Sequence, residues 1–141
     1  LTAQGKISPN GTDELGIAYS FTQDHTGTIW IGTKGNGLIA ATPNGDSKSF
    51  RLQQYTAKTD NIYSISGNNI YSLYEDKQHR LWIATFEGGI NFLNLDAGSQ
   101  SPQFINYRNR LKNYPISQCY RTRFVTSDPK ETSGSAALPA C

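Results

Sequence analysis

The sequence predicts an all-β fold made of two similar antiparallel sheets, and three observations predict it. Residues 18–40 align with residues 70–92 without a gap and share seven identities in 23 positions. The copies start 52 residues apart, counted from Asp24 to Asp76, and a period of this size is typical of propellers and other arrays of small units. The composition, with 13 Gly, 8 Tyr and 6 Phe but only 17% charged residues, suits many short strands and tight turns.

The first copy is expected to form four strands. Gly16–Gln23 alternates in the manner of a strand, with Ile17, Tyr19 and Phe21 on one face. Asp24 and Gly27 then favour a turn, because an aspartate side chain can bond nearby amides and glycine accepts positive φ. The remaining strands and the hairpin turn between the second and third are Thr28–Thr33, Gly35-Asn36-Gly37, Leu38–Thr42 and Ser49–Tyr55.

The second copy repeats this order, with His79 where the first has Gly27. Histidine is one of the few other residue types that tolerate a left-handed backbone. Its strands are expected at Asn69–Glu75, Arg80–Thr85, Gly89–Leu95 and Gln103–Tyr107. Runs such as Leu81-Trp82-Ile83 are apolar on both faces, as in strands buried on both sides. Gly32 and Ala84 are equivalent and small, which suits a place where a neighbouring backbone comes close.

A third copy begins and then stops. Tyr120–Ser127 is similar to a first strand and Asp128 is in register, but the tryptophan due at position 134 is Gly134. Glu131–Cys141 has no strand pattern, and we expect it to be disordered or poorly packed.

The phrase Asp24-x-x-Gly27-x-Ile29-Trp30-Ile31-Gly32-Thr33-x-x-x-Gly37-Leu38, and its second form from Asp76 to Ile90, resemble the two-component-regulator propeller repeat. The run from Asn68 to Asp76 is also similar to the lead-in of that repeat. This resemblance covers roughly residues 16–128. It departs from the family pattern at His79, at Ala84 and at the missing third tryptophan.

The resemblance implies a partial propeller of about two four-stranded blades with extra strands at the ends. We expect blade 1 at residues 16–66, blade 2 at 67–119, the first strand of a truncated third blade at 120–128 and a disordered tail at 129–141. Residues 1–15 are expected to be a lead-in, with the last strand of a preceding blade as one reading. Two blades cannot close a ring, so the chain should pack against missing blades or against other copies of itself, forming a homo-oligomer if it is stable alone.

By resemblance, this is a non-catalytic segment of the extracytoplasmic sensor region of a hybrid histidine kinase, many of which come from gut Bacteroidetes. Such regions respond to oligosaccharides and belong to two-component signal transduction. A periplasmic location follows from the resemblance, although the chain shows no signal peptide, and its kinase is absent. The alternative is a kelch-like protein-interaction repeat with a scaffold role. A propeller enzyme, such as a lyase or glycosidase, is disfavoured because no acid pair or metal site stands out.

Hairpin turns that differ between the copies are the predicted ligand-binding positions, because scaffold residues are committed to packing. The candidates for an oligosaccharide contact are Lys34, Asn36, Phe86 and Glu87, which combine a stacking ring with hydrogen-bonding groups. Ordinary exposed turns are the competing reading.

Residues that are identical at the same position of both copies are predicted to be structural: Trp30, Trp82, Asp24, Asp76, Gly37 and Gly89. The tryptophans are expected in the core and the aspartates as turn caps. We interpret His25 and His79 as surface residues, because they occupy non-equivalent turn positions and no Cys or acidic partner stands at zinc spacing. No metal and no cofactor are expected.

Charge and cysteine content add little. A net charge of +2 gives no argument for a nucleic-acid partner, and no stretch is long and apolar enough to contact a membrane as a span. Cys119 and Cys141 could pair in an oxidising compartment, but a bond to the last residue of an unstructured tail is not the favoured reading.

Overall fold

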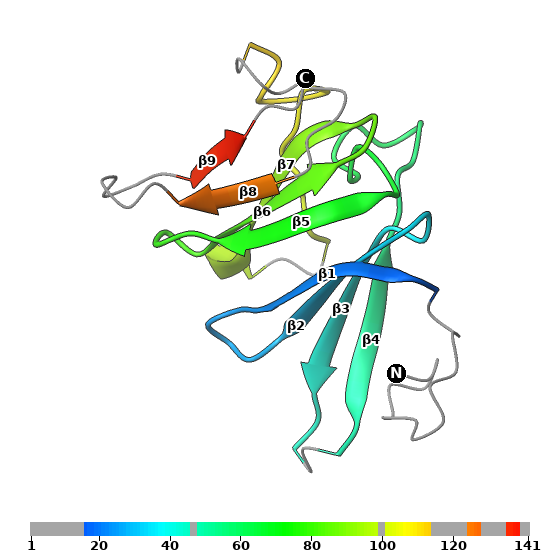
Figure 1. Ribbon diagram of the computed structural model, residues 1–141, viewed down its shortest axis with the longest axis vertical. Helices are drawn as coiled ribbons and strands as arrows, with labels where there is room; N and C mark the ends of the chain where they lie inside the picture. The colour runs from blue at the N-terminus through cyan, green and yellow to red at the C-terminus, as the bar shows by residue number, and fades with distance from the viewer. Residues whose placement is uncertain (1–15, 46–47, 99–100, 114–123, 128–134, 139–141) are drawn as a thin grey trace.

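The prediction of an all-β protein is confirmed by a computed structural model, which describes residues 16–45, 48–98, 101–113, 124–127 and 135–138. Within these ranges the regular structure is nine strands and one short 3₁₀ turn (Figure 1). The described ranges contain no helix with the length and apolarity needed to cross a bilayer. Residues 1–15, Cys119 and Cys141, on which predictions were made, lie outside them.

Blade 1 is an antiparallel sheet of four strands in sequence order. It consists of β1 (Ala18–Gln23), β2 (Ile29–Thr33), β3 (Leu38–Pro43) and β4 (Phe50–Tyr55). Trp30 pairs with Thr22 on one side and with Ala40 on the other. Each strand falls within about two residues of its expected position, because alternation and turn residues agree at every boundary.

Blade 2 repeats the arrangement with β5 (Ile70–Glu75), β6 (Arg80–Thr85) and β7 (Gly89–Asn94). The fourth strand expected at Gln103–Tyr107 is not formed. It is reduced to one bridge, in which the backbones of Phe92 and Ile105 exchange hydrogen bonds of 2.9 and 2.8 Å. The pairing ends there because the chain turns at Asn106, whose carbonyl accepts hydrogen bonds from the amides of Asn109 (3.1 Å) and Leu111 (3.0 Å).

A third, two-stranded sheet consists of β8 (Phe124–Ser127) and β9 (Ser135–Leu138). β8 packs against β5 and β6, as β5 packs against β1 and β2 (Figure 1). The expectation that Glu131–Cys141 carries no strand is wrong at β9, because antiparallel pairing with β8 satisfies its backbone whatever its side chains. The other residues of the expected tail lie outside the described ranges, and the domain boundaries stay predictions.

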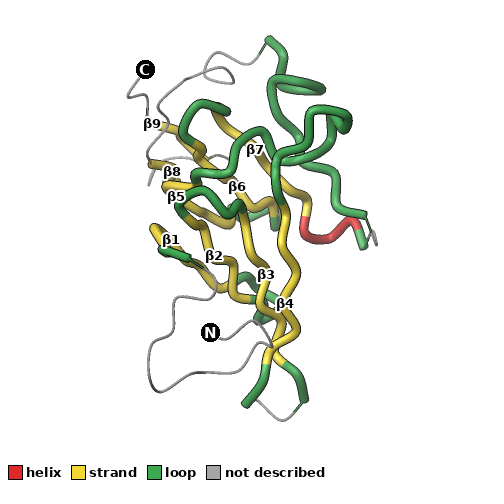
Figure 2. The backbone as a smooth tube through the Cα atoms, turned by 90° about the vertical axis from the view of Figure 1, so that its right-hand side faces the viewer, coloured by secondary structure: helices red, strands yellow, loops and turns green. Residues whose placement is uncertain are grey.

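The main core lies between the two blades. Trp30, Leu38 and Ala40 of blade 1 pack against a group from blade 2 and its entry segment, which contains Ile65, Ile70, Leu81, Ile83, Leu93 and Phe104. Both views show β1 and β5 as neighbours where the sheets meet (Figure 2). A second cluster on the opposite face of blade 2 contains Trp82, Ala84 and Ile90.

Gly32 is a point where the two blades pack closely. A Cβ at this position would lie 2.5 Å from Cγ2 of Ile70 and 2.7 Å from Oγ of Ser20. The neighbour that requires a small residue is therefore a side chain of the next blade rather than its backbone. The close packing of β5 onto blade 1 depends on the missing side chain.

Candidate functional site

Each copy of the repeat contains a turn organised by its aspartate. Oδ1 of Asp24 accepts hydrogen bonds from the amides of Thr26 (2.9 Å) and Thr28 (3.0 Å). Its other oxygen accepts a 2.7 Å bond from the indole N–H of Trp30, a contact that the sequence analysis did not foresee. Burial would raise the pKa of Asp24, but these bonds together hold the pKa below its usual value.

Asp76 has the same role in blade 2, with an added cation. Its Oδ1 accepts from the amides of Gln78 and Arg80, and its Oδ2 accepts 2.7 Å bonds from both Arg80 Nε and Trp82 Nε1. Burial by itself would raise the pKa of Asp76, but these hydrogen bonds together hold the pKa below its usual value. Trp30 and Trp82 are 6% and 5% exposed, so neither ring offers a free face for a ligand.

The two hairpin turns that carry the predicted ligand residues are brought to one edge of the molecule. The amides of Gly35 and Gly37 donate to the carbonyl of Asn68, and the amide of Phe86 donates to the carbonyl of Asn69. Lys34 and Asn36 are exposed, Glu87 is exposed with a φ of 69°, and Phe86 is half-buried. Gly37 and Gly89 both have positive φ and accept a bond from the threonine four residues earlier.

An aromatic row runs from blade 1 to this edge. Tyr19 stacks on Tyr71 with ring centroids 5.2 Å apart, and Phe86 meets Tyr71 edge-on at 5.9 Å. Phe86 thus belongs to an aromatic row that includes residues from both blades. Sequence reasoning selected Phe86 but not the tyrosines, because they read as strand residues.

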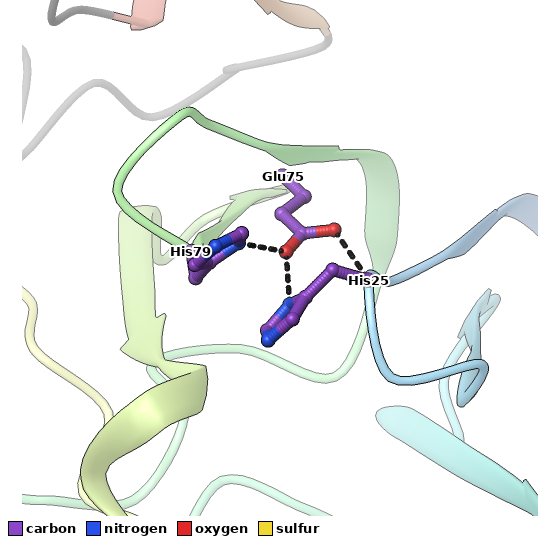
Figure 3. Close-up of side chains that lie close together, drawn as sticks. All are labelled: His25, Glu75 and His79. Carbon is purple, nitrogen blue, oxygen red and sulfur yellow. Dashed lines mark hydrogen bonds and ion pairs between the residues drawn. The ribbon is translucent and has the colours of Figure 1, made fainter.

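Two histidines and a glutamate meet at the junction of the blades. His25, in the β1–β2 turn, and His79, in the β5–β6 turn, place their Nδ1 atoms 2.6 and 2.9 Å from the same oxygen, Oε1 of Glu75 (Figure 3). Their rings stack with centroids 3.7 Å apart. We refer to His25, Glu75 and His79 as the junction cluster.

The interpretation of these histidines as surface residues holds, but the expectation that they lack an acidic partner is wrong, because both contact Glu75. Their side chains are 31% and 41% exposed, and that of Glu75 is 15% exposed. The hydrogen bond to Glu75 raises the pKa of His25, and the charges of Glu75 and Asp96 add to the effect. One signal could have found the cluster: in stacked sheets, equivalent turns become neighbours, and both histidines of the chain lie in such turns.

A groove of about 540 Å³ lies along β7 and the segment after it. Its lining includes Trp30, Phe92, Leu95 (in the 3₁₀ turn η1, Leu95–Ala97), Ile105 and Arg110. None of the four predicted ligand residues contributes to this lining.

Parts of this chain are similar to one family model and to two known proteins. The family model described as two component regulator propeller matches residues 15–35 and 64–87. The chain is 30% identical over 77 residues to histidine kinase P4 of Formosa agariphila, a match that covers 55% of this chain and 5% of the kinase. It is also similar to the extracellular domain of the putative one component system BT4673 from B. thetaiotaomicron, at 38% identity and a TM-score of 0.43. That match covers 54% of this chain and 10% of the other.

Proposed function

We propose that this chain is a non-catalytic, ligand-sensing segment of a two-component sensor. The family model described as two component regulator propeller matches it at two places, one in each blade. The observation that carries this proposal is the recurrence in two blades of the aspartate, the tryptophan and the later glycine (Gly37 and Gly89), together with the match to a histidine kinase. The chain spans only 5% of that kinase, so kinase activity belongs to the proposed parent protein.

The proposed ligand is an oligosaccharide that binds the edge formed by the two hairpin turns. Phe86 belongs to the aromatic row and its half-buried ring is the proposed stacking surface, while Lys34, Asn36 and Glu87 are exposed hydrogen-bonding groups on the same edge. Sugars are bound by this combination, since the apolar face of a sugar ring packs on an aromatic ring and its hydroxyls need polar partners.

A glycan array followed by calorimetric titration tests this function. We expect saturable binding of a defined oligosaccharide that weakens at least tenfold in Phe86→Ala. Phe21→Ala is the matched control, because Phe21 is 78% exposed but lies on β1 away from the hairpin turns. Binding only to a protein, with no response to any glycan, would favour the kelch-like scaffold role instead.

We further propose that a neighbouring blade of the parent protein covers the exposed face of β1. Ile17 and Phe21 are 59% and 78% exposed, whereas Leu73, the counterpart of Phe21 in blade 2, is half-buried and packs on the core beside blade 1. In the isolated chain a second copy could take this place. Size-exclusion chromatography with light scattering measures the outcome, and a well-folded monomer at all concentrations would count against the need for a partner.

The proposed location is periplasmic. This proposal follows from the resemblance of the two repeat motifs to those of extracytoplasmic sensor regions. Cell fractionation of a strain that expresses the parent protein, with protease added to intact spheroplasts, would show cleavage of the propeller from the outside. Complete protection of this segment would overturn the proposed location.

A further inference from the structure

We propose that the junction cluster is a binding site for a divalent transition-metal ion of the zinc class, formed jointly by the two blades. Its three residues each offer one ligand atom, and these atoms all lie within 4.8 Å of one another. The proposal does not depend on the sensing function above, because it uses side chains at a different place from the hairpin turns.

The geometry of the cluster is close to that of a metal site. Zinc bound at about 2.0–2.1 Å in a tetrahedron needs ligand atoms about 3.3 Å apart. The Nδ1 atoms of His25 and His79 stand 2.6 and 2.9 Å from Oε1 of Glu75. To bind an ion, each histidine nitrogen must move away from Oε1 of Glu75 by less than about 1 Å. The two stacked rings must also turn about χ2 until both Nδ1 lone pairs point to the same ion.

The donor set selects the class of ion. Two imidazole nitrogens and one carboxylate oxygen suit Zn²⁺, Cu²⁺ and Ni²⁺, whereas Mg²⁺ and Ca²⁺ prefer sites made of oxygen alone. Three protein ligands leave a fourth position for water or for a further ligand. A divalent ion also changes the role of the shared oxygen, because Glu75 then need not accept from two stacked imidazoles at once.

Neighbouring groups already orient two of the ligands. The backbone amide of His25 donates to Oε2 of Glu75 at 2.9 Å, which turns Oε1 toward the two rings. Nε2 of His25 lies 3.3 Å from Oδ1 of Asp96, so this carboxylate can hold the proton on Nε2 and leave the Nδ1 lone pair for the ion. Such outer partners of metal-bound histidines fix the tautomer and the ring orientation.

The backbone of His79 is fixed as well. Its φ is 56°, its amide donates to the carbonyl of Asp76 at 3.1 Å, and its carbonyl accepts from the amide of Leu95 at 2.9 Å. The residue is therefore held from both sides at the position where the first repeat has Gly27. A bound ion would link the β1–β2 turn of blade 1 to β5 and its turn in blade 2.

Titration of the full chain with Zn²⁺ tests the site, with Co²⁺ as a spectroscopic substitute. The measurements are made on a Cys119→Ser/Cys141→Ser background, so that a thiol cannot supply the binding. We expect one Zn²⁺ per chain by calorimetry and visible Co²⁺ bands of tetrahedral intensity. His25→Ala and His79→Ala should each weaken Zn²⁺ binding at least tenfold, and Asp96→Asn should weaken it less.

Two controls keep the result interpretable. Glu75→Gln should weaken Zn²⁺ binding, whereas Asp60→Asn, which removes the same charge from an exposed turn outside both proposed sites, should leave Zn²⁺ binding unchanged. Thermal unfolding of each variant without metal shows that it still folds, and Zn²⁺ should raise the Tm of the parent chain but not of His25→Ala. Absence of saturable Zn²⁺ binding, or binding that survives the loss of both histidines, would overturn the proposal.

Discussion

Blade 1 and blade 2 are built from one repeated phrase, yet the same face of their first strands has a different fate. Phe21 in β1 is 78% exposed, while its counterpart Leu73 in β5 is half-buried and packs on the main core. Ile70 is fully buried, and its counterpart Ala18 is exposed. The alternation of a strand therefore predicts which side chains share a face, but the neighbouring sheet decides whether that face is buried.

The turns of the two blades make a second comparison. Both aspartates bond two amides and an indole, but Asp76 also pairs with Arg80, whose guanidinium lies 5.4 Å from the Trp82 ring centroid. In blade 1 the corresponding residue is Thr28, which donates only its amide to Asp24. The carboxylate and the tryptophan are thus the shared device, and the cation is an addition specific to blade 2.

The largest effect is expected from removing the tryptophan at the blade junction. Trp30→Ala should lower the free energy of unfolding by about 3–5 kcal/mol, because a buried indole leaves a large cavity. It also removes the hydrogen bond to Asp24. Urea unfolding followed by circular dichroism measures the change, and a loss below about 1 kcal/mol would show that blade 2 does not pack on this ring as described.

Loss of one turn carboxylate should have the next largest effect. In the wild type, Oδ2 of Asp76 accepts hydrogen bonds from Arg80 and Trp82. In Asp76→Asn these two donors face either an NH₂ group or an uncharged oxygen, so we expect the free energy of unfolding to fall by about 1–3 kcal/mol. Asp24→Asn should cost less, because no cation is left without its partner. Equal losses in parallel urea titrations would mean that Arg80 adds nothing to the blade 2 turn.

A similar or smaller loss of stability is expected when a side chain is added at Gly32, where the blades pack closely. Gly32→Ala places a methyl group against Ile70 and Ser20, and such overpacking typically costs about 1–3 kcal/mol. The reciprocal change Ala84→Gly should cost only about 0.5–1 kcal/mol, through backbone entropy in a strand. If differential scanning calorimetry finds Gly32→Ala as stable as the parent chain, the blades are further apart than the contact distances indicate.

The smallest effect tests the comparison of the two first strands directly. Phe21→Ala should change the free energy of unfolding of the monomer by less than about 0.5 kcal/mol, because its ring is exposed. Leu73→Ala should cost clearly more, since Leu73 packs on the core. The order is measured at low protein concentration, and reversal at high concentration would reveal a second copy on the face of β1.

The strands that the sequence predicted well are those in which alternation, turn residues and the repeat all agree, such as β2 and β6. Sequence reasoning failed where pairing depends on a distant partner. Gln103–Tyr107 alternates as a strand should, but the chain turns at Asn106, whose carbonyl accepts from the amides of Asn109 and Leu111. β9 has little side-chain signal and exists through its pairing with β8.

The candidate sites show the same division. Phe86 and Lys34 could be selected from sequence because hairpin turns are local features that differ between the copies. The junction cluster could not be read in this way, because His25 and Glu75 are 50 residues apart and meet only when the blades stack. His25 and His79 occupy different positions of the repeat, so aligning the two copies does not pair them, although stacking of the blades makes them neighbours.

The missing side chain at Gly32, which lets Ile70 of the next blade pack closely, has a consequence for the symmetry of any ring built from these units. In a closed ring the rotations that relate each blade to the next must sum to 360°. The separation between two neighbouring blades helps to set the rotation between them. The corresponding residue one unit later is Ala84, larger by a methyl group. Successive steps in such a ring therefore differ slightly in separation, and its rotational symmetry is approximate.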